Sequence, residues 1–201
     1  YGVNVPHAYT IAYTCFGLSC IISPDVPNNA GSLAPFTVRA PEGSILNAPY
    51  PAAVCSRHVI GQMLPDTVFG CLAQAVPERI PAEGAGCLWN LTFRGETDRG
   101  SNDASIFCIT AVTNGGTGAR PSKDGLSATA YPSGVRGTPV EINESVAPIV
   151  VWRKEYRTDS GGAGAQRGGL GQVIEVGSAI DADLELLAAF DRIDYPPRGR
   201  D

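Results

Sequence analysis

Apolar residues recur at helical spacing in the first part of the chain. Between residues 7 and 22 they are three or four positions apart, at Ala8, Ile11, Ala12, Cys15, Leu18 and Ile22. This spacing is typical of one buried helix face. Pro6 suits the first turn of a helix and Pro24 ends the pattern. We therefore expect an amphipathic helix over residues 7–22.

A second helical stripe covers residues 59–75, where Pro65 interrupts it. Proline lacks a backbone N–H and clashes with the preceding turn, so the pattern predicts either a kinked helix or two helices that meet at Leu64. Between the two helical regions, residues 25–31 have loop composition. Residues 36–40 alternate between apolar and polar side chains, which predicts a short, half-buried strand.

The pattern changes to strands after Pro77 and Pro81. Apolar or alternating runs typical of strands occupy residues 87–93, 104–112, 148–157, 172–176 and 184–190. Glycine-rich segments at residues 114–118 and 161–171 are expected to connect strands. The predicted fold class is α+β, helical in its first third and then mostly antiparallel β-sheet with glycine-rich loops.

The same change of pattern divides the chain into two regions. Residues 1–82 are expected to be mostly helical with one short strand, and residues 83–201 are expected to be rich in strands. Together they form one domain or part of a larger subunit, because 201 residues suffice for a substantial core.

Composition excludes several classes of partner. The formal net charge is -5, so the basic surface of a nucleic-acid-binding protein is missing and an anionic membrane is an equally poor partner. The longest nearly apolar run, residues 11–22, is far shorter than the roughly 20 residues that span a bilayer. Tyr1 stands where an initiator Met would, and no signal peptide follows it. We expect a cytoplasmic protein.

Low charge suggests that the chain is a piece of something larger. Charged residues make up 17% of the sequence, whereas Gly 24 and Pro 16 make it rich in turns; globular chains average about 25% charged residues. Such a surface is expected to be covered by more polypeptide or by a partner subunit.

Cysteine and histidine do not predict a metal site. The six cysteines include no C-x-x-C pair, and the two histidines, His7 and His58, stand alone. We interpret the cysteines as small buried apolar residues in a reducing compartment. Ser56 lies close to His58 in sequence, but that proximity says little about a catalytic pair.

The glycine-rich segments resemble phosphate-binding loops only in composition. Neither matches G-x-x-x-x-G-K-[ST] or G-x-G-x-x-G, so we expect no ATP to bind to this chain itself. Each segment carries arginine next to aspartate: Arg120 with Asp124, and Arg157 and Arg167 around Asp159. An arginine fork suits a carboxylate or phosphate. The alternative is that these arginines pair with the neighbouring aspartates and cap loop carbonyl groups.

Two short polar side chains follow the apolar run that starts at Cys87. The amide of Asn90 and the hydroxyl of Thr92 would project from the end of a strand, where they would orient a substrate carbonyl. The alternative is a turn whose polar groups satisfy one another.

An ordered series of segments resembles the hydantoinase B/5-oxoprolinase family, which includes the B subunits of ATP-dependent hydantoinase and N-methylhydantoinase. The resemblance covers nearly the whole chain and its motifs are specific. They are SPDVPNNAG at 23–31, PEGSILN at 41–47, PAAV at 51–54, NLTF at 90–93, GGTGARP at 115–121 with DG at 124–125, TPVE at 138–141, DSGGAG at 159–164 and RGGLG at 167–171.

The resemblance implies a division of labour between subunits. Family members are longer than this chain and work beside an ATP-using A-type subunit, which holds ATP and Mg and phosphorylates the carbonyl oxygen of a small cyclic amide. The B subunit then completes ring hydrolysis within a hetero-oligomer. Related acetone and acetophenone carboxylases bind a divalent metal, Zn or Mn, through segments that precede the region present here. This chain is therefore expected to bind no cofactor or metal itself.

The resemblance and the residues together give a set of candidate roles. Arg120, Arg157 and Arg167 would hold an anion, and Asn90 and Thr92 would orient the substrate. Asp124 or Asp159 would be the base that deprotonates water, although a neighbouring arginine weakens an aspartate as a base.

Two positions depart from the family pattern and leave the substrate open. Trp89 stands where the family tends to have a second asparagine, and Arg94-Gly95 stands where it has Gly-Gly. The leading hypothesis is part of a subunit of an ATP-dependent cyclic-amide hydrolase, inactive alone. The alternatives are a subunit of an ATP-dependent ketone carboxylase and a non-catalytic scaffold or interface segment.

Overall fold

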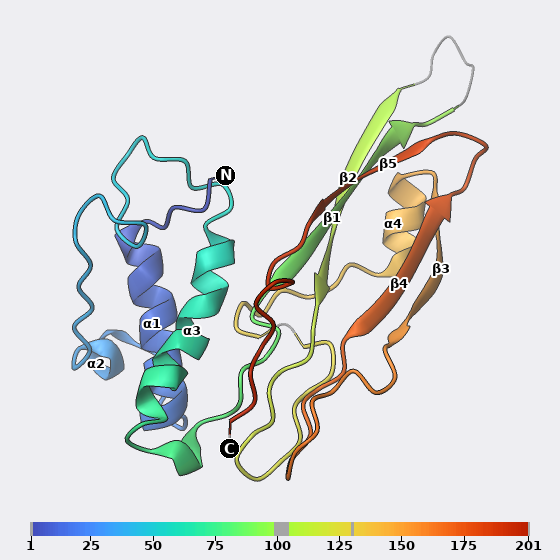
Figure 1. Cartoon of the computed structure of the whole chain (residues 1–201). Coiled ribbons are helices and arrows are strands. Elements are labelled where there is room, and N and C mark those ends of the chain that lie inside the picture. The colour runs from blue at the N-terminus through green and yellow to red at the C-terminus, as the bar shows by residue number, and fades with distance from the viewer. Residues whose placement is uncertain (1, 99–104, 130, 201) are drawn as a thin grey trace.

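The computed structural model describes residues 2–98, 105–129 and 131–200. Its elements lie in layers (Figure 1): the first helices on one side, a three-stranded sheet in the middle, and a two-stranded sheet with a short helix on the other side. The predicted α+β class is confirmed. Tyr1 and Ala104, which entered the expectations above, lie outside the described residues.

Two long helices form the first layer. α1 spans His7–Ile22, as the apolar spacing predicts. α3 spans His58–Leu72 and continues through Pro65 as one helix, so the alternative of two helices meeting at Leu64 is wrong. No helix in the described ranges is long and apolar enough to cross a membrane.

The segment between α1 and α3 differs from the expectation. Residues 36–40 form no strand; the Phe36 N–H instead donates to Leu33 O at 3.0 Å. Alternation alone does not make a strand, because a strand also needs a partner edge. A loop was expected at residues 25–31, but a short helix, α2, begins there and spans Ala30–Leu33. The Asn29 side chain caps it by accepting hydrogen bonds from two backbone N–H groups.

The middle sheet is antiparallel with the order β2-β1-β5. β1 spans Leu88–Glu96, β2 spans Ile106–Asn114 and β5 spans Leu184–Ala189. β1 is therefore the central strand, although β5 comes from the far end of the chain. All three strands were predicted within a few residues of their bounds.

The remaining strands, β3 at Ile149–Tyr156 and β4 at Gln172–Ser178, pair antiparallel to each other. Beside them lies α4, Val140–Val146, which the sequence did not predict because seven residues are too few for a periodic pattern. A single turn of 3-10 helix, Pro77–Arg79, leads from the helical layer towards β1.

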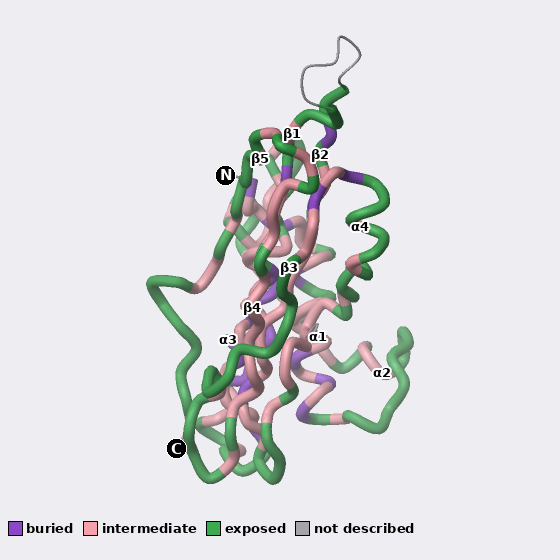
Figure 2. Tube along the Cα trace, turned by 90° about the vertical axis from the view of Figure 1, so that its right-hand side faces the viewer, coloured by how far each residue is buried: buried purple, intermediate pink, exposed green. Residues whose placement is uncertain are grey.

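Each layer has its own apolar core. Ile21, Phe69 and Ile80 form one cluster among the helices, and Phe93, Phe107, Ala147 and Ile149 form another between the sheets. Figure 2 shows that buried positions are short stretches inside the layers, whereas much of β3 and the C-terminal segment is exposed.

Candidate functional site

The two faces of β1 meet different surroundings, because alternate side chains of a strand point to opposite sides. Leu91 and Phe93 face the β3–β4 sheet, where they contribute to the core. Asn90, Thr92 and Arg94 face the other way, and the first of them reaches α3. The residues predicted to orient a substrate therefore share one face of the central strand.

The predicted polar pair makes hydrogen bonds within the chain. Asn90 Nδ2 lies 3.1 Å from His58 Nε2, and donates to it when that ring nitrogen is unprotonated. Thr92 Oγ1 lies 2.9 Å from Thr110 Oγ1 on β2. His58, which sequence reasoning set aside, thus fixes the amide of Asn90. The substrate-orienting roles of Asn90 and Thr92 stay predictions.

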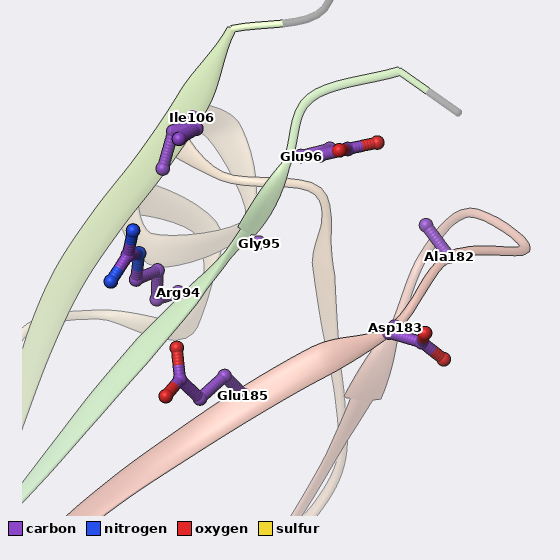
Figure 3. Close-up of a pocket in the computed structure, with 7 residues that line it drawn as sticks. All are labelled: Arg94, Gly95, Glu96, Ile106, Ala182, Asp183 and Glu185. Carbon is purple, nitrogen blue, oxygen red and sulfur yellow. The ribbon is translucent and has the colours of Figure 1, made fainter. Parts of the chain in front are cut away.

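A polar hollow of about 420 Å³ continues this face beyond Thr92. In Figure 3, Arg94 from β1 and Glu185 from β5 extend to the same side of the sheet, as expected for residues paired in register. The lining residues are Arg94, Gly95, Glu96, Ile106, Ala182, Asp183 and Glu185. One cation and three carboxylates make this hollow acidic on balance.

The opposite face of β1 borders a larger cavity of about 900 Å³ between the two sheets. Its walls are mostly apolar and come from β1, β4 and β5, with polar side chains at the edge. They include Cys87, Trp89, Leu91, Phe93, Thr113, Arg157, Ser160, Gln172, Val173, Ile174, Glu175, Val176, Leu186 and Phe190.

Of the predicted anion-binding residues, Arg157 is the one that lines this cavity. Its backbone is fixed just after β3: its N–H donates to Gly171 O at 2.9 Å, and its carbonyl accepts from Ser160 Oγ at 2.7 Å. Asp159, which lies between Arg157 and Ser160 in the sequence, is exposed and has a left-handed φ of 56°. The guanidinium of Arg157 is exposed.

Arg120, Asp124 and Arg167 meet in a loop junction away from the polar face of β1. Arg120 Nε and Nη2 donate to Asp124 O at 3.0 and 2.7 Å, and Asp124 Oδ1 accepts from the Arg167 backbone N–H at 2.8 Å. This geometry matches the alternative in which Arg120 caps a loop carbonyl. The roles of these three residues and of Asp159 in anion binding or catalysis stay predictions.

The glycine-rich segments pack backbone against backbone. A Cβ at Gly116 would overlap the carbonyl of Gly169, and one at Gly169 would overlap the carbonyl of Leu126. Backbone hydrogen bonds tie the same segments together, with Gly169 N–H donating to Thr117 O at 2.9 Å. Glycine is needed here for close approach of three loops.

A buried ionic cluster, missed from the sequence, joins the helices to the sheet layer. Arg192 Nη1 lies 3.4 Å from Asp66 Oδ2, and Arg192 Nη2 lies 2.8 Å from Glu83 Oε2. Arg198 also pairs with Glu83 at 3.2 Å. The signal was present in α3, where His58, Gln62 and Asp66 recur every four residues and so share one helix face.

Burial and neighbouring charges act against each other on the carboxyl groups of this region. It raises the pKa of Asp66 to about 6, and the charge of Arg192 opposes that shift. Burial also acts to raise the pKa of Glu83, but hydrogen bonds and charges from Arg192 and Arg198 outweigh it, so the pKa is lowered. Burial raises the pKa of the Cys87 thiol to about 11 and that of Asp191 above its ordinary value.

The cysteines are less uniform than expected. Cys15 is buried, but Cys55, Cys71 and Cys108 are exposed, so the interpretation of all six as buried apolar residues is wrong. Within the described ranges, no three His, Cys, Asp or Glu side chains are grouped so as to hold a metal ion.

Comparison with known proteins identifies the class. The model of the hydantoinase B/oxoprolinase family matches residues 1–201, and the chain belongs to this family. Curated relatives include a 5-oxoprolinase from Dictyostelium discoideum, 32% identical over 198 residues, which are 98% of this chain and 14% of that protein. Another is the caprolactamase subunit beta of Pseudomonas jessenii, 31% identical over 88% of this chain and 31% of that subunit.

Solved structures share the fold. The crystal structure of ATP-dependent caprolactamase from Pseudomonas jessenii aligns with a TM-score of 0.69 at 26% identity, over 89% of this chain and 31% of that one. A nucleotide-free acetone carboxylase aligns with a TM-score of 0.61 at 21% identity, over 85% of this chain and 23% of that one. The chain thus spans less than a third of each of these proteins.

Proposed function

We propose that this chain is part of a B-type subunit of an ATP-dependent hydrolase that opens small cyclic amides. The observation that carries the proposal is the family match over residues 1–201. Relatives named for 5-oxoproline and caprolactam, two cyclic amides of different ring size, support it. A relative named as a subunit also supports a hetero-oligomer.

The chemistry divides between two subunits. An A-type partner holds ATP and Mg and transfers the terminal phosphoryl group to the amide oxygen, which releases ADP. Water then adds to the activated carbon, the C–N bond breaks, and phosphate leaves with the ring-opened amino acid. Because the reaction consumes ATP, we assign the complex to the cytoplasm. Any divalent metal is assigned to polypeptide outside this chain.

The residues of this chain would bind and orient the activated ring. An activated amide carries negative charge on its phosphate, which an arginine fork can pair. Arg157, exposed beside an apolar cavity, has the better position for this task than Arg120, whose fork is occupied by Asp124 O. Asp124 and Asp159 remain the candidates for the base.

The test uses the complete subunit with its A-type partner. ATP consumption and ring opening are measured together for 5-oxoproline, hydantoin and caprolactam. We expect one of these to be opened with ATP consumed in step with ring opening, because the proposed scheme uses a phosphoryl transfer for each ring. ATP consumption that requires bicarbonate and a ketone instead would establish the carboxylase alternative. Turnover that survives substitution of every candidate residue here would establish the scaffold alternative.

A further inference from the structure

We propose that the cavity between the two sheets binds the ring of the cyclic amide, with Arg157 at its edge pairing the anionic part of the ligand. This inference rests on the proposed function and deepens it, since it gives the substrate a location. The cavity volume of about 900 Å³ lies in the range of small-molecule sites, roughly 300–1,000 Å³.

The walls suit the methylene groups of a small ring. Leu91 from β1, Ile174 from β4 and Leu186 from β5 contribute apolar surface from three strands of two sheets. Removing the apolar edge of a ring from water into such a cavity is favourable. Because the walls belong to paired strands, their positions are fixed by the sheet registers.

An aromatic pair forms part of the wall. The rings of Trp89 and Phe190 lie 4.3 Å apart between centroids, and both residues line the cavity. Trp89 Nε1 donates to Asp191 O at 3.0 Å, which fixes the orientation of the indole. The pair therefore presents a rigid, flat surface against which a ring can lie.

The charge at the edge selects an anion. Two charged residues line the cavity, Arg157 and Glu175. Glu175 lies opposite Arg153 in the β3–β4 register and interacts with its charge. Among the described residues, no hydrogen bond or ion pair involves the Arg157 guanidinium. An exposed guanidinium without a carboxylate partner beside apolar walls complements a ligand with an apolar ring and one anionic group.

Adjacent leucines of β5 supply a matched pair of variants. Leu186 is 51% exposed and lines the cavity, whereas Leu187 is 52% exposed and faces the other side of the sheet. Leu186→Trp fills the cavity and Leu187→Trp adds the same bulk outside it. Because both positions are exposed, neither substitution overpacks a core.

Binding is measured by titration calorimetry on the complete subunit without ATP or partner, using 5-oxoproline, which carries a carboxylate, and caprolactam, which is neutral. We expect Leu186→Trp to weaken both ligands by about tenfold or more and Leu187→Trp to leave both unchanged. Arg157→Gln should weaken 5-oxoproline by about tenfold and caprolactam little. Arg79→Gln, an exposed arginine of the helical region, is the charge control.

A second readout does not depend on the folding of these variants. The two tryptophans of this chain are Trp89 and Trp152. In a Trp152→Phe variant, the tryptophan fluorescence of this chain comes from Trp89, which lines the cavity, and bound ligand should change that fluorescence. Comparison with Trp89→Phe in the same background isolates the signal within the complete subunit.

The outcomes separate the location from the function. Equal binding by the Leu186→Trp and Leu187→Trp variants, with no Trp89 signal, overturns the proposal and indicates that other polypeptide fills the cavity. Ring-opening that is insensitive to Leu186→Trp leaves the proposed function in place and removes this location. Cavity-dependent binding without ring-opening by the whole complex keeps the site and removes the hydrolase assignment.

Discussion

The pKa of Asp66 is shifted by the burial of its side chain between the helices and the sheet. Asp66 is charged in water, yet here it lies on a helix face against the sheet layer with 8% of its side chain exposed. Removal from water disfavours the carboxylate, and Arg192 compensates only in part, so the pKa of Asp66 is raised from 3.8 to about 6. This shift gives the folded protein a higher proton affinity than the unfolded chain.

Stability should therefore fall as pH rises from about 4 to about 6, because the folded state binds more protons than the unfolded state in that interval. The contribution of Asp66 is fully present below pH 4 and lost above pH 6. In Asp66→Asn, which stays neutral, this fall should be smaller. Urea unfolding of the two proteins at several pH values measures the difference, and identical curves of stability against pH would contradict the shift.

Asn90 allows a test of substrate orientation at the residue scale. Because Asn90 faces away from the cavity, a substrate held there does not meet its amide, and Asn90→Ala in the complete complex should leave KM unchanged. A rise in KM of about tenfold, the equivalent of one hydrogen bond, would instead place the substrate carbonyl on the polar face of β1 and contradict the cavity as its location. Asn28→Ala, on an exposed residue of the first region, is the control. Unchanged kinetics in Asn90→Ala would leave this amide with a structural role alone.

At the scale of elements, the glycine-rich segments act as packing surfaces. Three loops converge where their backbones touch, and a side chain at the contact points would force them apart. Loop backbone in such a place forms hydrogen bonds between segments rather than with water, as the N–H groups of Gly125 and Gly169 do with Arg167 O and Thr117 O. The loops thereby hold the start of β4 against the end of β2.

Two glycines of one segment give a direct test. Gly169→Ala should destabilise the protein by roughly 1–3 kcal/mol, because its Cβ would overlap the Leu126 carbonyl. Gly162→Ala, seven positions earlier, meets nothing within 4 Å and should change stability little. Chemical denaturation of both variants measures the difference. An equal effect in the two would mean that the loops do not pack through glycine.

The elements that sequence predicted well are those whose pattern is local. The α1 bounds follow from apolar spacing between Pro6 and Pro24, and strand positions follow from alternation. The prediction of a strand at residues 36–40 was wrong, because a strand needs a partner edge and no described strand pairs with this segment. The candidate site was only partly predictable. The sequence singled out Arg157, which lines the cavity, but the cavity itself and the contact between His58 and Asn90 depend on how separate layers meet.

At the scale of the whole molecule, two apolar cores are joined by a polar seam. The seam contains Asp66 from α3, Glu83 from the connection to β1, and Arg192 and Arg198 from the C-terminal segment. Arg200 adds a hydrogen bond from its Nε to Pro81 O at 2.9 Å. The end of the described chain therefore acts as a strap between helices and sheet.

Replacing Arg192, the cation that pairs with both Asp66 and Glu83, should weaken the contact between the helices and the sheet. Arg192→Met leaves two nearly buried carboxylates without their main counter-ion, so we expect a loss of roughly 3–5 kcal/mol in the free energy of unfolding. Arg198→Met, at a side chain that is 84% exposed, should cost less than about 1 kcal/mol. Urea unfolding measures the free energy of unfolding of both variants. Equal losses would contradict the expectation that a buried ion pair stabilises the protein more than an exposed one.

The position of β5 has a consequence for synthesis on the ribosome. β1 can pair with β2 as soon as both have emerged, but its other edge waits for β5. At ~5–20 residues per second, the roughly 70 residues between the end of β2 and the start of β5 take about 4–14 s to add. Throughout that interval the nascent β1–β2 hairpin exposes unpaired N–H and C=O groups along the free edge of β1. A chaperone that shields this edge would act during those seconds, before the last strand closes the sheet.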